Sequence, residues 1–204
     1  MRVSEKTVEL NFCTQFGKRV GRDIVWFGLT QRQEARAGFD AAVKLGARLL
    51  LFQFKASNHT MAGGERRFHL QHDQLEALRE RAGGRARSVF YVLPLVGTTH
   101  ELACRRPLLE ACWLMDANDL DGIKPPTKRN GESRKSQLHY ADVVPNMATI
   151  RSDPTDVPLT CAGEISGDWL HESDGMPGTT EHGFEEFWRF RRSLRGTAAA
   201  AMLR

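Results

Sequence analysis

Apolar residues recur at helical spacing near the start of the chain. Between residues 4 and 20 they fall three or four positions apart, which is the period of a helix with one buried face. These residues are Val8, Phe12, Cys13, Phe16 and Val20. Ser4 before the run is a favourable N-cap, and Gly21 after it is a stop signal. The pattern therefore predicts a helix from residue 4 to about residue 20.

Three segments with the composition of β-strands follow this helix. Residues 23–29 are rich in β-branched and aromatic side chains, and residues 38–45 and 47–56 lie on either side of Gly46. The last segment is almost continuously apolar over residues 49–54, which is typical of a central strand buried on both faces. A buried helix would produce a similar run, but the short length and the preceding glycine favour a strand.

The second and third of these segments predict a β-hairpin. A two-residue turn over residues 46–47 places Asp40 directly opposite Gln53. A turn over residues 45–46 instead leaves the same two residues as diagonal neighbours. Because side chains alternate between the faces of a strand, both registers place Asp40, Gln53 and Lys55 on one face.

Later elements are predicted from the same kinds of pattern. They are a helix at 73–82, a strand at 88–96, a helix at 99–115, a polar loop at 121–137, a strand within 140–150, an irregular stretch at 152–183 and a basic helix at 185–195. The order of elements up to residue 96 predicts an α/β fold with a mixed central sheet. We expect residues 1–96 to form the core and residues 97–204 to form a helical and irregular extension packed on the same domain.

Composition and charge narrow the class of protein. The chain has 204 residues, 41% of them hydrophobic, which is enough apolar material for one core. The net charge of +4 and the pI of about 9.0 are compatible with a nucleic-acid partner. The four cysteines are scattered without C-x-x-C spacing, and we expect reduced thiols in the core. With no signal-peptide pattern and no apolar run near the roughly 20 residues of a membrane span, we expect a cytoplasmic protein without a membrane partner.

A carboxylate also lies on the apolar face of the first predicted helix. Glu9 precedes Phe12 and Cys13 by about one turn, so its side chain shares their face instead of pointing to water. A buried carboxylate requires a partner or a metal ion. Glu9 therefore joins Asp40 and Gln53 as a candidate metal ligand.

These residues, in this order, resemble a known superfamily of enzymes. A glutamate on the first helix, an aspartate on the second strand and an E/Q-x-K motif on the third strand are similar to the PD-(D/E)XK nucleases, also called restriction-endonuclease-like. The matching residues are Glu9, Asp40 within Gly38-Phe39-Asp40, and Gln53-Phe54-Lys55. The resemblance covers residues 4–96. Phe39 stands where the family usually has a proline, and Gln53 stands where it usually has an acidic residue.

The resemblance implies a restriction-endonuclease-like αβββαβ core, followed by an irregular C-terminal half that ends in a basic helix. It implies a metal-dependent nuclease that hydrolyses phosphodiester bonds, with DNA as the expected partner. Asp40, Gln53 and Glu9 would bind Mg²⁺ or Mn²⁺, and Lys55 would orient the attacking water, so all four are candidate catalytic residues. Small relatives of this kind are common in phage defence, and a homodimer would bring together two sites that cut both strands.

The same residues are compatible with other functions. A catalytically inactive module that binds nucleic acid or a protein partner is the alternative, because Gln53 removes one negative charge from the metal site. A structural subunit would instead expose a large apolar patch. His69 and His72 could suggest a zinc site, but no cysteine pair lies nearby, so we expect them to be hydrogen-bonded or surface histidines without a metal ion. His72 and Gln74 could reach the rim of the nuclease-like site. No phosphate-binding glycine loop or Ser-His-Asp spacing is present, so neither ATP-dependent nor acyl-transfer chemistry is predicted.

Overall fold

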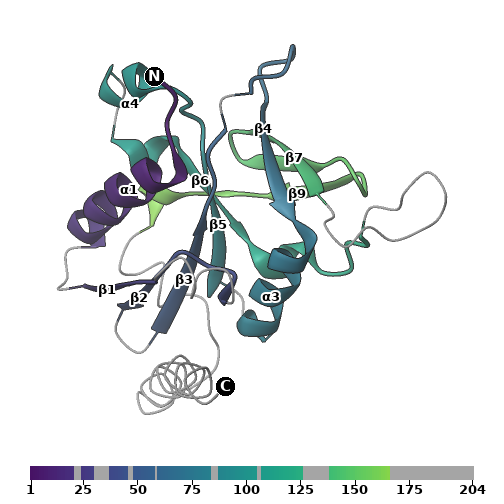
Figure 1. The fold of residues 1–204 in the computed structure, drawn as a ribbon, viewed down its shortest axis with the longest axis horizontal. Coiled ribbons are helices and arrows are strands. Elements are labelled where there is room, and N and C mark those ends of the chain that lie inside the picture. The colour runs from purple at the N-terminus through teal and green to yellow at the C-terminus, as the bar shows by residue number, and fades with distance from the viewer. Residues whose placement is uncertain are drawn as a thin grey trace, which may run out of the picture.

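A computed structural model gives the arrangement of the chain (Figure 1). It describes residues 1–20, 24–29, 37–45, 48–57, 59–83, 87–104, 107–125 and 138–165. The described residues form a mixed α/β structure with two β-sheets. The predicted basic helix at 185–195 and most of the predicted loop at 121–137 lie outside these residues. Among the described residues, no helix is both long enough and apolar enough to span a membrane.

The helices and strands have the following bounds. They are α1 (Glu5–Val20), β1 (Val25–Gly28), β2 (Ala41–Leu45), β3 (Arg48–Phe54), β4 (Arg66–Gln71), α3 (His72–Ala82), β5 (Val89–Pro94), α4 (Thr99–Cys104), β6 (Cys112–Asp116), β7 (Leu138–Val144), β8 (Met147–Ile150), β9 (Thr155–Pro158) and β10 (Thr160–Cys161). Three short 3₁₀ helices complete the set: η1 (Leu108–Ala111), η2 (Ala117–Leu120) and η3 (Ala162–Glu164).

The larger sheet has six strands in the order β1-β2-β3-β5-β6-β10. Strands β1, β2 and β3 form an antiparallel meander, and β3 pairs in parallel with β5. Ala41 pairs with Phe52, and Leu45 pairs with Arg48. This confirms the first of the two predicted registers.

The two faces of the large sheet are covered by different helices, which lie to the left and right of it in Figure 1. Helix α1 buries Val8, Phe12, Phe16 and Val20 in one core with Leu50, Phe52 and Phe54 of β3. Helix α3 buries Leu75, Leu78 and Ala82 in the other core, together with Leu51 and the inner face of the second sheet. Successive residues of β3 therefore point alternately toward α1 and toward α3.

The segment after residue 96 differs from its predicted helix. Helix α4 ends at Cys104, and residues 112–116 form the fully buried strand β6, paired antiparallel with β5. Trp113 and Met115 enter the core beneath α3, whereas Leu114 enters the core beneath α1. A strand that is buried on both faces has no polar side, so its run of apolar residues cannot be distinguished from that of a buried helix. The predicted helix is therefore wrong over residues 112–116.

The second sheet, β4-β7-β8-β9, is the other feature that the hydrophobic pattern describes incompletely. Residues 66–71 form β4, a strand that is not among the elements predicted from the sequence. The single strand predicted within 140–150 is a hairpin, β7 and β8, and its turn has Asn146 at φ 70°. Of the four free cysteines, Cys112 and Cys161 are buried as expected, whereas Cys104 is exposed.

A buried ion-pair cluster holds the second sheet together. Asp142 of β7 is 3% exposed and accepts two hydrogen bonds from the guanidinium of Arg67, at 2.6 and 2.7 Å. Arg151, after β8, donates to the same carboxylate at 2.6 Å. The hydrogen bond from Arg67, helped by Arg151, lowers the pKa of Asp142 against the opposing effect of burial.

We predict that Asp142→Asn lowers the free energy of unfolding at pH 7 by about 2 kcal/mol. The loss is smaller than for a fully buried pair because the Arg151 side chain is 56% exposed. A carboxyl with a lowered pKa contributes stability above its ordinary value of 3.8, and that stability disappears as the pH falls below it. Urea unfolding at pH 7 and at pH 3 measures the difference. Asp156→Asn, at an exposed position of β9, is the control, and equal stability of both variants at pH 7 would contradict the prediction.

Candidate active site

Three of the four predicted site residues meet at the ends of β2 and β3. Asp40 immediately precedes β2, Gln53 is the penultimate residue of β3, and Lys55 follows its last residue. The backbone amide of Asp40 donates to Phe52 O, which extends the hairpin ladder to Asp40. Residues 51, 53 and 55 share one side of β3, which is the side that faces α3. The alternation along β3 is therefore what aims Gln53 and Lys55 at α3.

A continuous hydrogen-bond network joins these side chains. Asp40 Oδ2 accepts from Gln53 Nε2 at 2.8 Å and from the backbone amide of Phe54 at 2.7 Å. Gln53 Oε1 accepts from Gln74 Nε2 at 2.8 Å, and Gln74 Oε1 accepts from Lys55 Nζ at 2.8 Å. Gln53 is only 3% exposed, so the network satisfies a buried amide that would otherwise cost stability. Gln74, in the first turn of α3, is thus a full member of the cluster and not only a rim residue.

Glu9 has its ion-pair partner on its own helix. Its carboxylate forms an ion pair with Lys6 at 2.7 Å, one turn earlier on α1. Its charge also acts on Cys13, whose pKa is raised mainly by burial and secondarily by Glu9. Helix α1, which carries Glu9, covers the face of β3 opposite to Gln53. Glu5, in the first turn of α1, is the helix carboxylate whose charge acts on Lys55.

The Lys55 ammonium is held in a partly dehydrated position. Burial lowers the pKa of Lys55, and the negative charges of Glu5 and Asp40 oppose that shift. A cation in such a position, beside one carboxylate, is suited to a ligand that brings further negative charge, such as a phosphate.

Two oxygen atoms that could bind a metal ion lie beside the side-chain nitrogen of Gln53. Its nitrogen lies 2.8 Å from Asp40 Oδ2 and 3.1 Å from the backbone carbonyl oxygen of Phe54. Rotation of the amide by half a turn would put Oε1 in place of the nitrogen, so that three oxygens face one point. Mg²⁺ accepts such ligands and keeps several waters. Within the described parts of the chain, no group of three or more His, Cys, Asp or Glu side chains could hold a metal ion, so a cation here would rest on one carboxylate.

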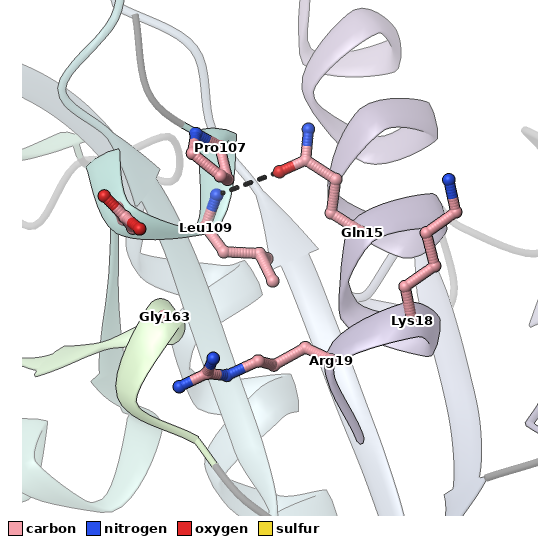
Figure 2. Close-up of a pocket in the computed structure, with 7 residues that line it drawn as sticks. Gln15, Lys18, Arg19, Pro107, Leu109 and Gly163 are labelled. Atoms are coloured by element: carbon pink, nitrogen blue, oxygen red, sulfur yellow. Dashed lines mark hydrogen bonds between the residues drawn. The ribbon is translucent and has the colours of Figure 1, made fainter. Parts of the chain in front are cut away.

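A cavity of about 390 Å³ lies elsewhere on the molecule (Figure 2). Its walls come from the last turns of α1, from η1 and from Gly163 of η3, and Gln15 spans it by accepting from the backbone amide of Leu109. Two of its lining residues, Lys18 and Arg19, lie roughly 20 Å along the axis of α1 from Glu5, at 1.5 Å per residue. Glu5 is the residue of α1 whose charge acts on Lys55. This cavity contains none of the network residues, and we do not assign the candidate site to it.

Comparisons with models of protein families, with curated proteins and with solved structures found no match to this chain.

Proposed function

We propose that this protein is a metal-dependent nuclease that hydrolyses phosphodiester bonds of DNA. The observation that carries the proposal is the cluster of Asp40, Gln53 and Lys55 at the carboxyl end of β3. An oxygen-rich metal position beside a lysine ammonium is what phosphodiester hydrolysis requires.

The chain connectivity supports the same proposal. A helix precedes an antiparallel meander of three strands, and α3 then leads to β5, which is parallel to β3. This is the order that we infer for a restriction-endonuclease-like core, with β4 and the second sheet as additions to it. In such a core, Asp40, Gln53 and Lys55 would correspond to the acidic and lysine residues of the nuclease motif.

The residues of the cluster have distinct roles in the proposed reaction. Asp40 Oδ2, the Phe54 carbonyl and a rotated Gln53 Oε1 would hold Mg²⁺ or Mn²⁺, which supplies charge at the phosphate and lowers the pKa of a bound water. Lys55 would orient the attacking water and neutralise charge on the scissile phosphate. Asp40 is the residue on which metal binding depends most, since Gln53 is neutral.

The network also couples the metal position to Lys55. If Gln53 turns its oxygen toward Asp40 and the metal, its nitrogen faces Gln74, which must then turn its own oxygen toward Gln53. Gln74 would no longer accept from Lys55 Nζ, since its nitrogen would face the ammonium. Metal binding would thereby release Lys55 to contact water and phosphate.

The direct test is cleavage of defined nucleic acids by the purified full chain. Supercoiled plasmid, single-stranded DNA and RNA are incubated with Mg²⁺, with Mn²⁺ or with a chelator. We expect metal-dependent cleavage of DNA that the chelator stops. Cleavage of RNA alone would correct the substrate, and the absence of cleavage of every substrate would remove the catalytic proposal.

We predict that Gln53→Glu raises the affinity for Mg²⁺ by about tenfold or more, because a second carboxylate joins Asp40 at the metal position. Without metal, the two carboxylates repel each other, so the melting temperature should fall and recover when Mg²⁺ is added. Calorimetric titration and thermal unfolding measure both effects. Gln71→Glu, at an exposed end of β4, is the control, and an unchanged Mg²⁺ affinity in Gln53→Glu would contradict the proposed ligand set.

A second function is favoured by one observation. The Gln53 amide already donates to Asp40, so the network is complete without a metal ion. This supports a non-catalytic nuclease-like module that binds nucleic acid or a protein partner. Binding of DNA without cleavage, at Mg²⁺ concentrations that saturate Gln53→Glu, would favour this alternative.

A further inference from the structure

Three side chains outside the Asp40 network form a second hydrogen-bonded line. Ser152, in the turn after β8, has its hydroxyl 2.6 Å from Nδ1 of His139 in β7. Nε2 of His139 is 2.9 Å from Nδ1 of His72, the first residue of α3. Ser152 and His139 are 13 positions apart across the β7–β8 hairpin. His72 is 67 positions from His139, and the packing of the second sheet against α3 brings these two together.

The residues of this line differ in their exposure to solvent. His139 is 1% exposed, whereas Ser152 is exposed to solvent. Burial lowers the pKa of His139, with a further lowering by His72, and the carboxylate of Asp153 acts in the opposite direction. His139 is therefore neutral at pH 7 and has a nitrogen available to accept a proton.

The proton positions follow from the order of the three groups. If the Ser152 hydroxyl donates to Nδ1 of His139, the proton of His139 is on Nε2 and is donated to Nδ1 of His72. His72 then fixes both the tautomer and the ring orientation of His139. A nucleophile within hydrogen-bond reach of a base, which a third group orients, is the arrangement that activates serine hydroxyls in unrelated folds.

We propose that Ser152 is an activated nucleophile that attacks small carboxylic esters, with His139 as its general base and His72 as the residue that orients His139. The geometry thus assigns to the chain an acyl-transfer site that the sequence did not predict, because the residues have no recognisable spacing. The site uses none of the side chains of the proposed nuclease, so the two proposals can fail separately.

The proposed reaction has two balanced steps. Ser152 Oγ forms a bond to the ester carbonyl carbon while its proton moves to Nδ1 of His139. The tetrahedral species then collapses, the bond to the alcohol oxygen breaks, and His139 returns the proton to that oxygen, which leaves an acyl group on Ser152. Water then attacks the acyl carbon and gives a proton to His139. The bond to Ser152 Oγ breaks, His139 returns the proton to Oγ, and the carboxylic acid leaves.

The test uses p-nitrophenyl acetate with the full chain. We expect a burst of nitrophenolate of about one equivalent per chain and an acetyl group on Ser152 by peptide mass spectrometry. Ser152→Ala should abolish both. His72→Asn and His139→Gln should slow acylation by about 100-fold, the usual contribution of a general base. Ser4→Ala, which removes a different exposed hydroxyl, should acylate at the wild-type rate.

The pH profile separates this role from a structural one. Because the pKa of His139 lies below its ordinary value of 6.5, the neutral base persists below that pH, and the acylation rate should reach half its maximum below pH 6.5. Asp153→Asn, which removes the carboxylate that favours the charged form, should move the midpoint further down. Since Ser152 is exposed, Ser152→Ala is expected to fold. Acetylation of wild type and Ser152→Ala at equal rates, or no acetylation of wild type, would overturn the proposal.

Discussion

Asp40→Asn is expected to reduce metal-dependent cleavage of DNA by about 10³-fold, which is the size of effect seen when one preorganised charge-stabilising group is removed from an active site. Asparagine keeps the shape of the side chain and one oxygen that can accept from Gln53 and Phe54. The substitution removes the charge that would hold the cation. Metal titration and plasmid cleavage, measured on the same preparation, test whether binding and activity are lost together.

A substitution of Lys55 separates metal binding from hydrolysis. Lys55→Ala should leave Mg²⁺ bound and still stop hydrolysis, since Lys55 acts on water and phosphate and does not bind the metal. Asp156→Asn and Lys124→Ala, both at exposed positions, are the matched controls for the two charge changes. If Asp40→Asn binds Mg²⁺ as tightly as the wild type, the assignment of Asp40 as central ligand is wrong.

Phe52→Ala is expected to lower the free energy of unfolding by about 3–5 kcal/mol, the usual cost of removing a buried aromatic ring. Phe52 is fully buried at the centre of an aromatic cluster. Its ring centroid lies 5.4 Å from that of Phe12, 5.7 Å from Phe16 and 6.0 Å from Phe90. The ring therefore joins α1 to the large sheet, and its loss leaves a cavity that several neighbours would have to move together to fill.

Denaturant unfolding of the full chain measures this loss. Leu10→Ala, a change of the same kind at a position of α1 that is 60% exposed, should alter stability by no more than about 0.5 kcal/mol. Because Phe52 precedes Gln53 in β3, the metal affinity of the folded Phe52→Ala protein should also fall. A loss of stability as small as that of Leu10→Ala would show that Phe52 is not central to the core.

The sequence alone determined helix α1 and the pairing of β2 with β3. The helical spacing of Val8, Phe12 and Phe16 predicted α1, and the glycine between two strand-like segments predicted the hairpin. These features depend on residues close together in the chain. The period of two along a strand then required Asp40, Gln53 and Lys55 to share one face, whichever turn was used.

Only the tertiary structure decided what lies opposite that face. Period-2 alternation tells which residues of β3 point the same way, but not whether α1 or α3 covers them. Helix α1, which carries Glu9, covers one face of β3, and Gln74 of α3 completes the hydrogen-bond network on the other face. The strand β6 was likewise read as a helix, because a run buried on both faces carries no polar side to reveal its period.

The line from Ser152 through His139 to His72 is the clearest case of a feature that no local pattern contains. Each of its hydrogen bonds joins residues on different elements, and the bond between His72 and His139 spans 67 positions of the chain. Hydrophobic periodicity reports which side of an element is buried and leaves unspecified which distant element buries it. That choice is made by the packing of the second sheet against α3, and it is this packing that placed His72 beside the buried imidazole of His139.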